Sequence, residues 1–162
     1  MNKAIDETFM QAALKEAAKA GARFEVPIGA VVVADGRVIG RGHNRKETGL
    51  DPTLHAEITA IRSAARKLGA WRLEHTTLYV TLEPCLMCMG AIIQARIPRL
   101  VFAAFDPKAG ACGSVYDVSD DKRLNHRVKV ASRVCEPEAA RVLKGFFERL
   151  RSERKEKTRK EF

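Results

Sequence analysis

The chain has 162 residues, of which 46% are hydrophobic and 30% are charged, a composition typical of one globular domain with its own core. No apolar run is long enough to cross a membrane, and the acidic residues within positions 1–20 exclude a signal or transit peptide, so we expect a cytoplasmic location. The net charge of +9 and the pI of about 9.7 predict attraction to an anionic partner: a nucleic acid, a membrane surface or a phosphorylated metabolite.

The hydrophobic pattern along the chain predicts alternating helices and strands. Two β-rich runs flank Asp35-Gly36 and predict a hairpin, because glycine tolerates the positive φ of a tight turn. Asp51 or Thr53 can cap the helix that follows, and Gly69 ends it. The predicted order is helix, strand, strand, helix, strand, helix, strand, strand and helix, at about residues 4–20, 28–33, 38–42, 51–69, 76–82, 84–97, 99–105, 126–134 and 137–158.

This order predicts an α/β fold in a single domain over residues 1–162. Helices that alternate with single strands imply crossover connections and parallel pairing, whereas the hairpin strands must be antiparallel. We therefore expect a mixed five-stranded sheet with helices on both faces. The closing helix, at about 137–158, runs into a basic tail, since residues 149–162 contain seven basic and three acidic residues. A charge run of this kind is usually a solvated helix end.

Two short motifs lie at the starts of predicted helices. His55 and Glu57 form an H-x-E motif in "HAEITAI", and Cys85 and Cys88 form a C-x-x-C motif behind a proline in "LEPCLMCMGA". Ligand sites in sheets of this type lie where strands end and helices begin, so both motifs can face one cleft. Imidazole nitrogen and thiolate sulfur are ligands that zinc prefers, and a helix N-terminus favours the thiolate form.

Three protein ligands, His55, Cys85 and Cys88, predict a catalytic rather than a structural zinc site, because a structural site closes all four corners with protein. Zinc at an open corner lowers the pKa of water to about 7, and Glu57 is then the natural proton carrier. On a regular helix, however, residues i and i+2 point about 200° apart. His55 and Glu57 can serve one water only if it lies off the helix end or the first turn is irregular.

Several alternatives stay open at this point. Either motif alone occurs in ordinary structure, and a lone C-x-x-C is also typical of a thioredoxin-like redox pair. Cys112 and Cys135 are interpreted as small buried hydrophobic residues. Cys112 is the least implausible fourth ligand if the metal site is closed.

The combination H-A-E and P-C-L-M-C resembles the zinc-dependent cytidine and deoxycytidylate deaminase superfamily. The stretches "EVPIGAVVV", "GHNR", "DPTLHAEI", "LYVTLEPCLMCMGAI" and "FAAFDPKAGACGS" are similar to the bacterial tRNA-specific adenosine deaminases over most of the chain. This resemblance implies a three-layer α/β/α fold of the cytidine deaminase type, a homodimer, and one zinc ion per chain. It also implies conversion of the wobble adenosine of an arginine tRNA anticodon to inosine.

Residue by residue, the resemblance implies that His55, Cys85 and Cys88 bind zinc and that Glu57 shuttles protons. It also implies that Asn44 and the backbone of Ala56 hold the target base and ribose. The wall around the flanking anticodon nucleotides is then formed by Ile28, Asp106, Lys108 and Phe147.

The expected partner is therefore the anticodon loop of a tRNA, without a membrane or an organic cofactor. The basic tail suits phosphate attraction, and one of Phe146 and Phe147 is free to contact RNA if the other lies in the core. Two alternatives remain. The first is a deaminase of a free base or nucleoside, such as guanine or cytosine, which shares the zinc chemistry. The second is a zinc-stabilised RNA-binding module without activity.

Overall fold

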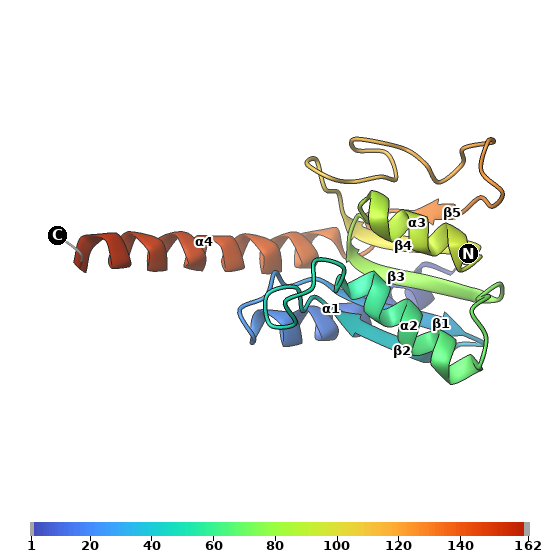
Figure 1. Cartoon of the computed structure of the whole chain (residues 1–162), viewed down its shortest axis with the longest axis horizontal. Helices are drawn as coiled ribbons and strands as arrows, with labels where there is room; N and C mark the ends of the chain where they lie inside the picture. Colours follow the sequence, from blue (N-terminus) through green and yellow to red (C-terminus); the bar gives the residue numbers. More distant parts are fainter. Residues whose placement is uncertain (1, 161–162) are drawn as a thin grey trace.

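The computed structural model describes residues 2–160 and the side chains of residues 2–156 (Figure 1). The elements follow the predicted order. The helices are α1 (Lys3–Gly21), α2 (Ala56–Leu68), α3 (Leu86–Gln94) and α4 (Glu136–Lys160), and the strands are β1 (Gly29–Ala34), β2 (Arg37–His43), β3 (Thr76–Leu82), β4 (Arg99–Ala104) and β5 (Lys129–Ala131).

The five strands form one mixed sheet in the order β2-β1-β3-β4-β5. Strand β1 pairs antiparallel with both β2 and β3, whereas β3–β4 and β4–β5 are parallel pairs. Helices α2 and α3 cover one face, and α1 with the first turns of α4 covers the other (Figure 1). The three-layer α/β/α fold expected from the sequence is thus confirmed.

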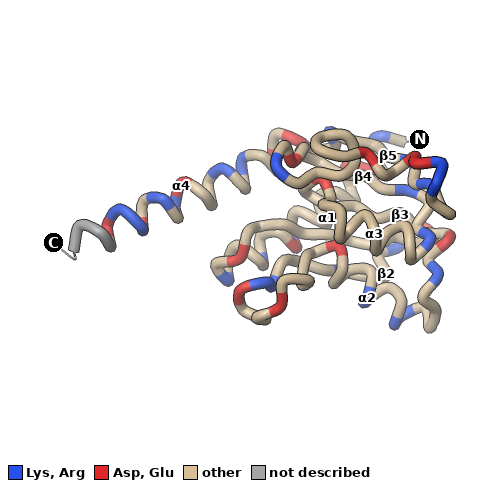
Figure 2. The backbone as a smooth tube through the Cα atoms, turned by 45° about the horizontal axis from the view of Figure 1, so that its top comes forward, with Lys and Arg blue, Asp and Glu red and all other residues tan. Residues whose placement is uncertain are grey.

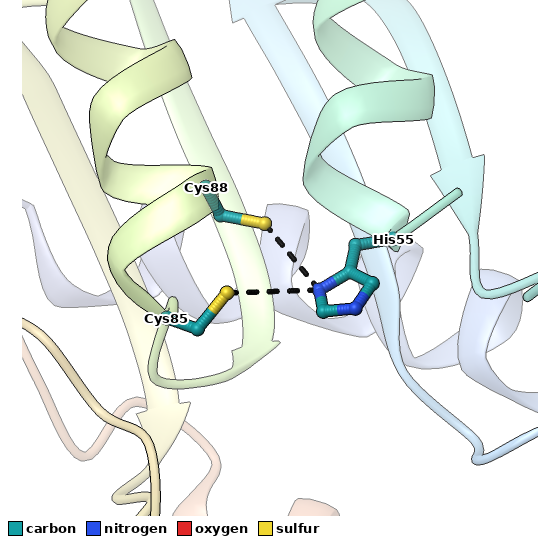
Figure 3. A group of neighbouring side chains, drawn as sticks. All are labelled: His55, Cys85 and Cys88. Carbon is teal, nitrogen blue, oxygen red and sulfur yellow. Dashed lines mark hydrogen bonds between the residues drawn. The ribbon is translucent and has the colours of Figure 1, made fainter. Parts of the chain in front are cut away.

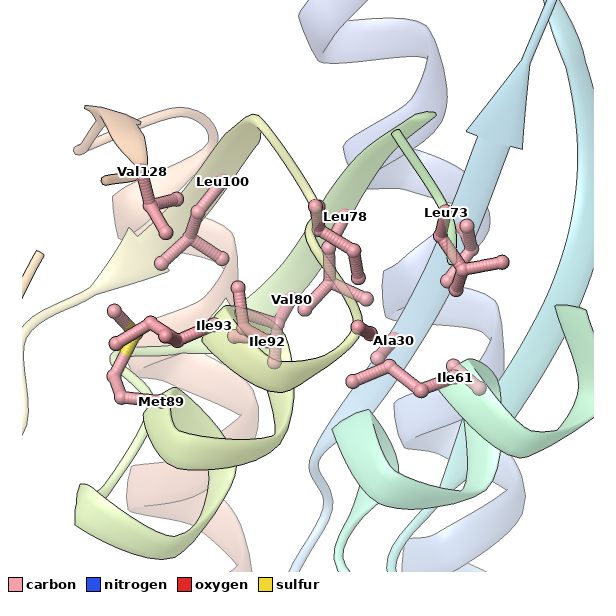
Figure 4. Close-up of a cluster of buried hydrophobic side chains, with 14 of the residues drawn as sticks. Ala30, Ile61, Leu73, Leu78, Val80, Met89, Ile92, Ile93, Leu100 and Val128 are labelled. Carbon is pink, nitrogen blue, oxygen red and sulfur yellow. The ribbon is translucent and has the colours of Figure 1, made fainter. Parts of the chain in front are cut away.

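Side chains that alternate along β1 build a core on each face of the sheet. Ala30 and Val32 pack with α2 and α3, while Val31 and Val33 pack with α1. The larger cluster lies between the sheet and the two helices that carry the sequence motifs (Figure 4). Because successive residues of a strand point to opposite faces, burial on both sides fixes the register of β1 and hence the positions of the strand ends.

The hairpin between β1 and β2 forms where the sequence predicts it. Asp35 and Gly36 both have positive φ angles, 47° and 69°, as a type I′ turn requires. This turn matches the right-handed twist of the strands, so β2 returns to the end of the sheet at which α2 begins.

The predicted start of α2 at residue 51 is wrong. The helix begins at Ala56, and His55 is its N-cap. The Asp51 side chain instead accepts hydrogen bonds from the backbone N–H and the hydroxyl of Thr53, at 2.8 and 2.7 Å, and closes a local turn before the helix. Asp51 is a good capping residue, but in this segment its side chain satisfies a turn.

The predicted bounds of two other elements also differ from the structure. Helix α3 covers 86–94 instead of 84–97, because Arg96 has a positive φ of 60° and breaks the helix. The last strand covers only 129–131 of the predicted 126–134, since the His126 ring contacts the Ile97 carbonyl at 2.8 Å and Arg133 has a φ of 65°. An alternation of apolar and polar residues predicts a strand, but hydrogen-bonded pairing with a neighbouring strand decides how long the strand is.

A partly buried ion pair fastens α1 to the sheet. The Arg99 guanidinium donates to both carboxylate oxygens of Asp6, at 2.8 and 2.7 Å, and the Tyr79 hydroxyl donates to the same carboxylate at 2.9 Å. The hydrogen bonds from Arg99 and Tyr79 lower the pKa of Asp6 although burial opposes them. Burial, together with Asp6, raises the pKa of Tyr79 to about 12.

Helix α4 extends well beyond the body of the protein (Figure 1). Lys and Arg recur along this extension (Figure 2). Among the described residues, no helix is both long and apolar enough to span a membrane.

Candidate metal centre and substrate cleft

His55 and Cys85 occupy equivalent positions at the starts of two helices. Each is the N-cap of its helix, α2 or α3, with an extended backbone, and neither side chain makes the usual capping hydrogen bond. Their side chains are therefore available to a ligand. Cys88 lies one turn further along α3 and is buried.

The three ligand atoms lie close enough to share one ion. His55 Nδ1 is 3.8 Å from Cys85 Sγ and 3.6 Å from Cys88 Sγ (Figure 3). A tetrahedral zinc ion at ordinary bond lengths separates a ligand nitrogen from a sulfur by about 3.6 Å. His55, Cys85 and Cys88 form a group that could hold a metal ion, and no fourth His, Cys, Asp or Glu joins it within the described chain.

The local backbone resolves how His55 and Glu57 can serve one site. His55 has an extended conformation, with φ −75° and ψ 157°, whereas Glu57 is in the first helical turn. His55 thus precedes the helix as its N-cap, so the separation of about 200° between residues i and i+2 on a regular helix does not apply to this pair. Glu57 is only 4% exposed, and burial raises the pKa of its carboxyl group. Burial disfavours the charged form of this carboxyl group.

Cys85 ionises readily at this site. Hydrogen bonding from Cys88 and His55 lowers the pKa of Cys85 to about 3, although burial opposes it. The contact with Cys85 raises the pKa of His55 in turn. A thiolate is the form of cysteine that binds a metal ion.

The other two cysteines lie apart from this group. Cys112 is buried, and burial raises the pKa of its thiol, as expected for a small core residue. Cys135 is half-buried, and its sulfur accepts a hydrogen bond from Gln11 at 3.7 Å. Cys112 is therefore not a fourth ligand in this structure.

A cleft of about 390 Å³ opens beside His55. The structure brings five of the predicted substrate residues to its walls: Ile28, Asn44, Asp106, Lys108 and Phe147. The backbone N–H of Ala56 is buried and donates to Asn44 Oδ1 at 3.0 Å, so Ala56 holds Asn44 in place. Phe147 is 43% exposed, whereas Phe146 is 5% exposed and belongs to the core.

Sequence reasoning missed several residues of this cleft. Lys46 follows Asn44 by two positions in the stretch "GHNRK". Its closeness in sequence to a predicted substrate residue was the available indication that it lines the cleft. The others are apolar residues whose sequence context looks like core: Val26, Leu82, Phe105, Pro107 and Leu143. Leu54, directly before His55, does not line the cleft; it packs against Gly49 and lines a neighbouring groove.

This neighbouring groove of about 630 Å³ runs along α2 and is strongly basic. Its lining contains no acidic residue, and Leu54, Thr59 and Ser63 are its uncharged members. Its basic members are Arg41, Arg45, Arg62, Arg66 and Lys67. Because the groove begins one residue from His55, the positive potential adjoins the metal centre.

Comparison with known proteins places this site in a family. A family model described as MafB19-like deaminase matches residues 4–151. The tRNA-specific adenosine deaminase of Bacillus subtilis (strain 168) is 48% identical over 150 residues, which are 93% of each chain. A solved structure from a study of A-to-I editing by tRNA:A34 deaminases at the wobble position of transfer RNA is 51% identical, with a TM-score of 0.81, over 84% of this chain and 99% of that one.

A guanine deaminase from Nitrosomonas europaea is a more distant structural neighbour. It is 26% identical, with a TM-score of 0.75, over 86% of this chain and 83% of that one. The same fold therefore accommodates deaminases with different substrates. The sequence identity of nearly half to the tRNA-specific adenosine deaminases, over most of the chain, decides between these families. The chain belongs to the family of tRNA-specific adenosine deaminases.

Proposed function

We propose that this protein is a zinc-dependent hydrolase that converts adenosine to inosine at the wobble position of a tRNA anticodon, with an arginine tRNA as the expected substrate. The observation that carries the proposal is that His55, Cys85 and Cys88 form a group that could hold a metal ion, with no fourth protein ligand among the described residues. The buried carboxyl group of Glu57 lies in the first turn of the helix that follows His55, and the cleft beside His55 is mainly apolar, with Lys46, Asp106 and Lys108 as its charged members.

The donor set fits zinc better than other common divalent ions. Two thiolates and one imidazole suit zinc, whereas Mg²⁺ and Ca²⁺ require oxygen ligands. Bound at this site, zinc would supply the Lewis acidity that makes water nucleophilic near neutral pH. We expect one zinc ion per chain.

Glu57 is the proton carrier in this proposal. The overall reaction adds water at the amino-bearing carbon of the purine ring and releases ammonia, so protons must move from the water to the ring nitrogen and to the leaving amine. Glu57 accepts the first proton and delivers it, because its carboxyl group is buried close to the ligand His55, and burial raises its pKa above the ordinary value. Its place in the first turn of α2 puts it next to the ligand His55.

Asn44 and the cleft wall hold the nucleotide. The Asn44 carbonyl already accepts the Ala56 N–H, which leaves its amide N–H groups to donate to the base or ribose. Ala56 therefore acts through Asn44. Ile28, Asp106, Lys108 and Phe147 contact the flanking nucleotides, and the half-exposed ring of Phe147 offers a surface on which a base can stack.

The distribution of charge supports an RNA substrate. Basic residues line the groove along α2, and further basic residues extend along α4 away from the body (Figure 2). A free base carries no phosphate and gains little from such a field, whereas an anticodon stem and loop gains at every phosphate. A loop base also leaves its stack at low cost, which suits a cleft that admits one base.

We further infer that the protein forms a homodimer and acts in the cytoplasm. Leu86 and Met87 on the outer side of α3, with Val115 and Tyr116, are exposed apolar residues. The loop that carries Val115 and Tyr116 is tied to the start of α3, because the N–H groups of both residues donate to the Gly110 carbonyl, and Gly110 forms a bridge with Cys85. Exposed apolar clusters of this kind are typical of subunit contacts.

Incubation with total tRNA, followed by sequencing that identifies inosine, tests the proposed function. The expected result is inosine at the wobble position of an arginine tRNA, with a stoichiometric release of ammonia. Parallel reactions with guanine, cytosine and adenosine test the free-base alternative. Ammonia release from a free base without inosine in tRNA would overturn the proposal. Binding of tRNA by the zinc-loaded protein without any deamination would identify a binding module.

A further inference from the structure

Two buried carboxylates outside the metal centre, Glu25 and Glu83, have an unusual set of partners. They are 1% and 2% exposed, and neither takes part in an ion pair among the described residues. A buried charge without a cation needs several hydrogen-bond donors. For both residues, these donors come from a loop that forms a wall of the substrate cleft.

Glu25 holds the loop between β2 and α2. One carboxylate oxygen accepts from the backbone N–H and the hydroxyl of Thr48, at 2.7 and 2.9 Å, and the other accepts from the Glu47 N–H at 3.2 Å. Burial alone would raise the pKa of Glu25, but these hydrogen bonds outweigh it and lower the pKa. Glu25 therefore stays ionised while it holds the loop.

Glu83 holds the loop that follows β4 in the same manner. One oxygen accepts from the N–H groups of Cys112 and Ser114, at 2.9 and 3.1 Å, and the other accepts from the Asp106 N–H at 3.0 Å and from the Ser114 hydroxyl. Gly110 lies directly against this carboxylate, with no space for a Cβ atom. The backbone of this loop is thus packed closely around the Glu83 carboxylate.

The two loops carry polar residues that line the cleft. Lys46 belongs to the loop held by Glu25, one residue before Glu47. Asp106 and Lys108 belong to the loop held by Glu83. Neither loop has a strand ladder or helix to order its backbone at these residues, so the buried carboxylates supply the hydrogen bonds that regular structure supplies elsewhere.

We propose that Glu25 and Glu83 are positioning residues that fix the two walls of the cleft and thereby set its affinity for the nucleotides that flank the target adenosine. This inference rests on the proposed function. The reacting groups His55, Glu57, Cys85 and Cys88 lie at the starts of α2 and α3, which pack on the sheet. Loosening a wall therefore weakens binding of the RNA and leaves the chemical step largely intact.

The experiment compares Glu25→Gln, Thr48→Val and Ser114→Ala with the wild type. Glu25→Gln keeps the shape of the side chain but places an N–H group opposite N–H donors. Thr48→Val removes one of the three hydrogen bonds to Glu25, and Ser114→Ala removes one bond to Glu83 without altering the segment that carries Cys85. Glu74→Gln is the matched control, because Glu74 is exposed and pairs only locally with Arg72.

For each variant, kcat and KM on the tRNA substrate are measured together with zinc content and thermal stability. We expect Glu25→Gln to raise KM about tenfold and to change kcat by less than about twofold, with one zinc per chain retained. Thr48→Val and Ser114→Ala should raise KM by a smaller factor, and Glu74→Gln should match the wild type.

An unchanged KM in folded, zinc-loaded Glu25→Gln and Ser114→Ala would overturn the inference. A fall in kcat at constant KM would also overturn it, because it would place these residues in the chemical step. If the wild type itself produces no inosine in tRNA, the proposed function fails instead, and this is apparent before any variant is compared.

Discussion

His55 Nδ1 lies 3.8 Å from Cys85 Sγ, and both residues are N-caps whose side chains make no capping hydrogen bond. An N-cap side chain normally accepts a bond from the first turn and contributes about 1 kcal/mol to the helix. In this protein both helices give up that contribution, and the two side chains meet each other instead. The starts of α2 and α3 are thus arranged for a metal ion rather than for maximal helix stability.

Glu57→Gln should retain the metal and lose activity. The amide has nearly the same shape as the carboxyl group but cannot carry a proton between water and substrate, so we expect kcat to fall by at least about 100-fold. Zinc content by mass spectrometry and inosine formation in tRNA are the measurements. Loss of stoichiometric zinc in this variant would show instead that Glu57 holds the metal.

Cys88→Ser should lose the metal, whereas Cys112→Ser and Cys135→Ser should keep it. Serine is a poor zinc ligand at neutral pH, so we expect the zinc affinity of Cys88→Ser to fall by more than about 100-fold. The other two thiols lie outside the ligand group. Competition with a chromophoric chelator measures the affinities. A metal-free Cys112→Ser protein would revive the closed, structural type of site.

Truncation after Phe147 should weaken tRNA binding at low salt. It removes seven basic and four acidic residues from α4 and beyond, so fewer counterions are released on binding and the dependence of affinity on salt becomes flatter. Binding is measured at several salt concentrations, with zinc content and thermal stability as folding controls. Equal affinity of the truncated and full-length proteins at every salt concentration would assign the tail to solubility alone.

Asp6→Asn should destabilise the fold by about 2 kcal/mol near pH 7, because it leaves the partly buried Arg99 without its counterion. Folding lowers the pKa of Asp6 from its usual 3.8, so the carboxylate stabilises the protein above that pH and loses this effect as the pH falls through the folded-state value. The stability difference between variant and wild type, from urea unfolding, should therefore shrink in acid. A difference that is constant down to the acid limit would contradict this assignment.

The two motifs and the order of elements could be predicted from the sequence. H-A-E and P-C-x-x-C are local patterns, and the hairpin at Asp35-Gly36 follows from the φ angles that these residues tolerate. The start of α2 could not be predicted, because the side chain of an aspartate such as Asp51 can either cap a helix or accept the hydrogen bonds of a turn. Nor could the pairing of Glu25 and Glu83 with distant loops, since an acidic residue in a sequence is read as solvated until its donors are known.

The sequence by itself thus determined which reactive side chains are present, because the H-x-E and C-x-x-C motifs are recognisable from residue type and spacing. Only the tertiary structure decided how these groups meet. The extended backbone of His55 sets its geometry with Glu57, and the sheet brings residues 55 and 85 together. The cleft residues come from five separate segments, and their convergence depends on long-range packing that no local pattern encodes.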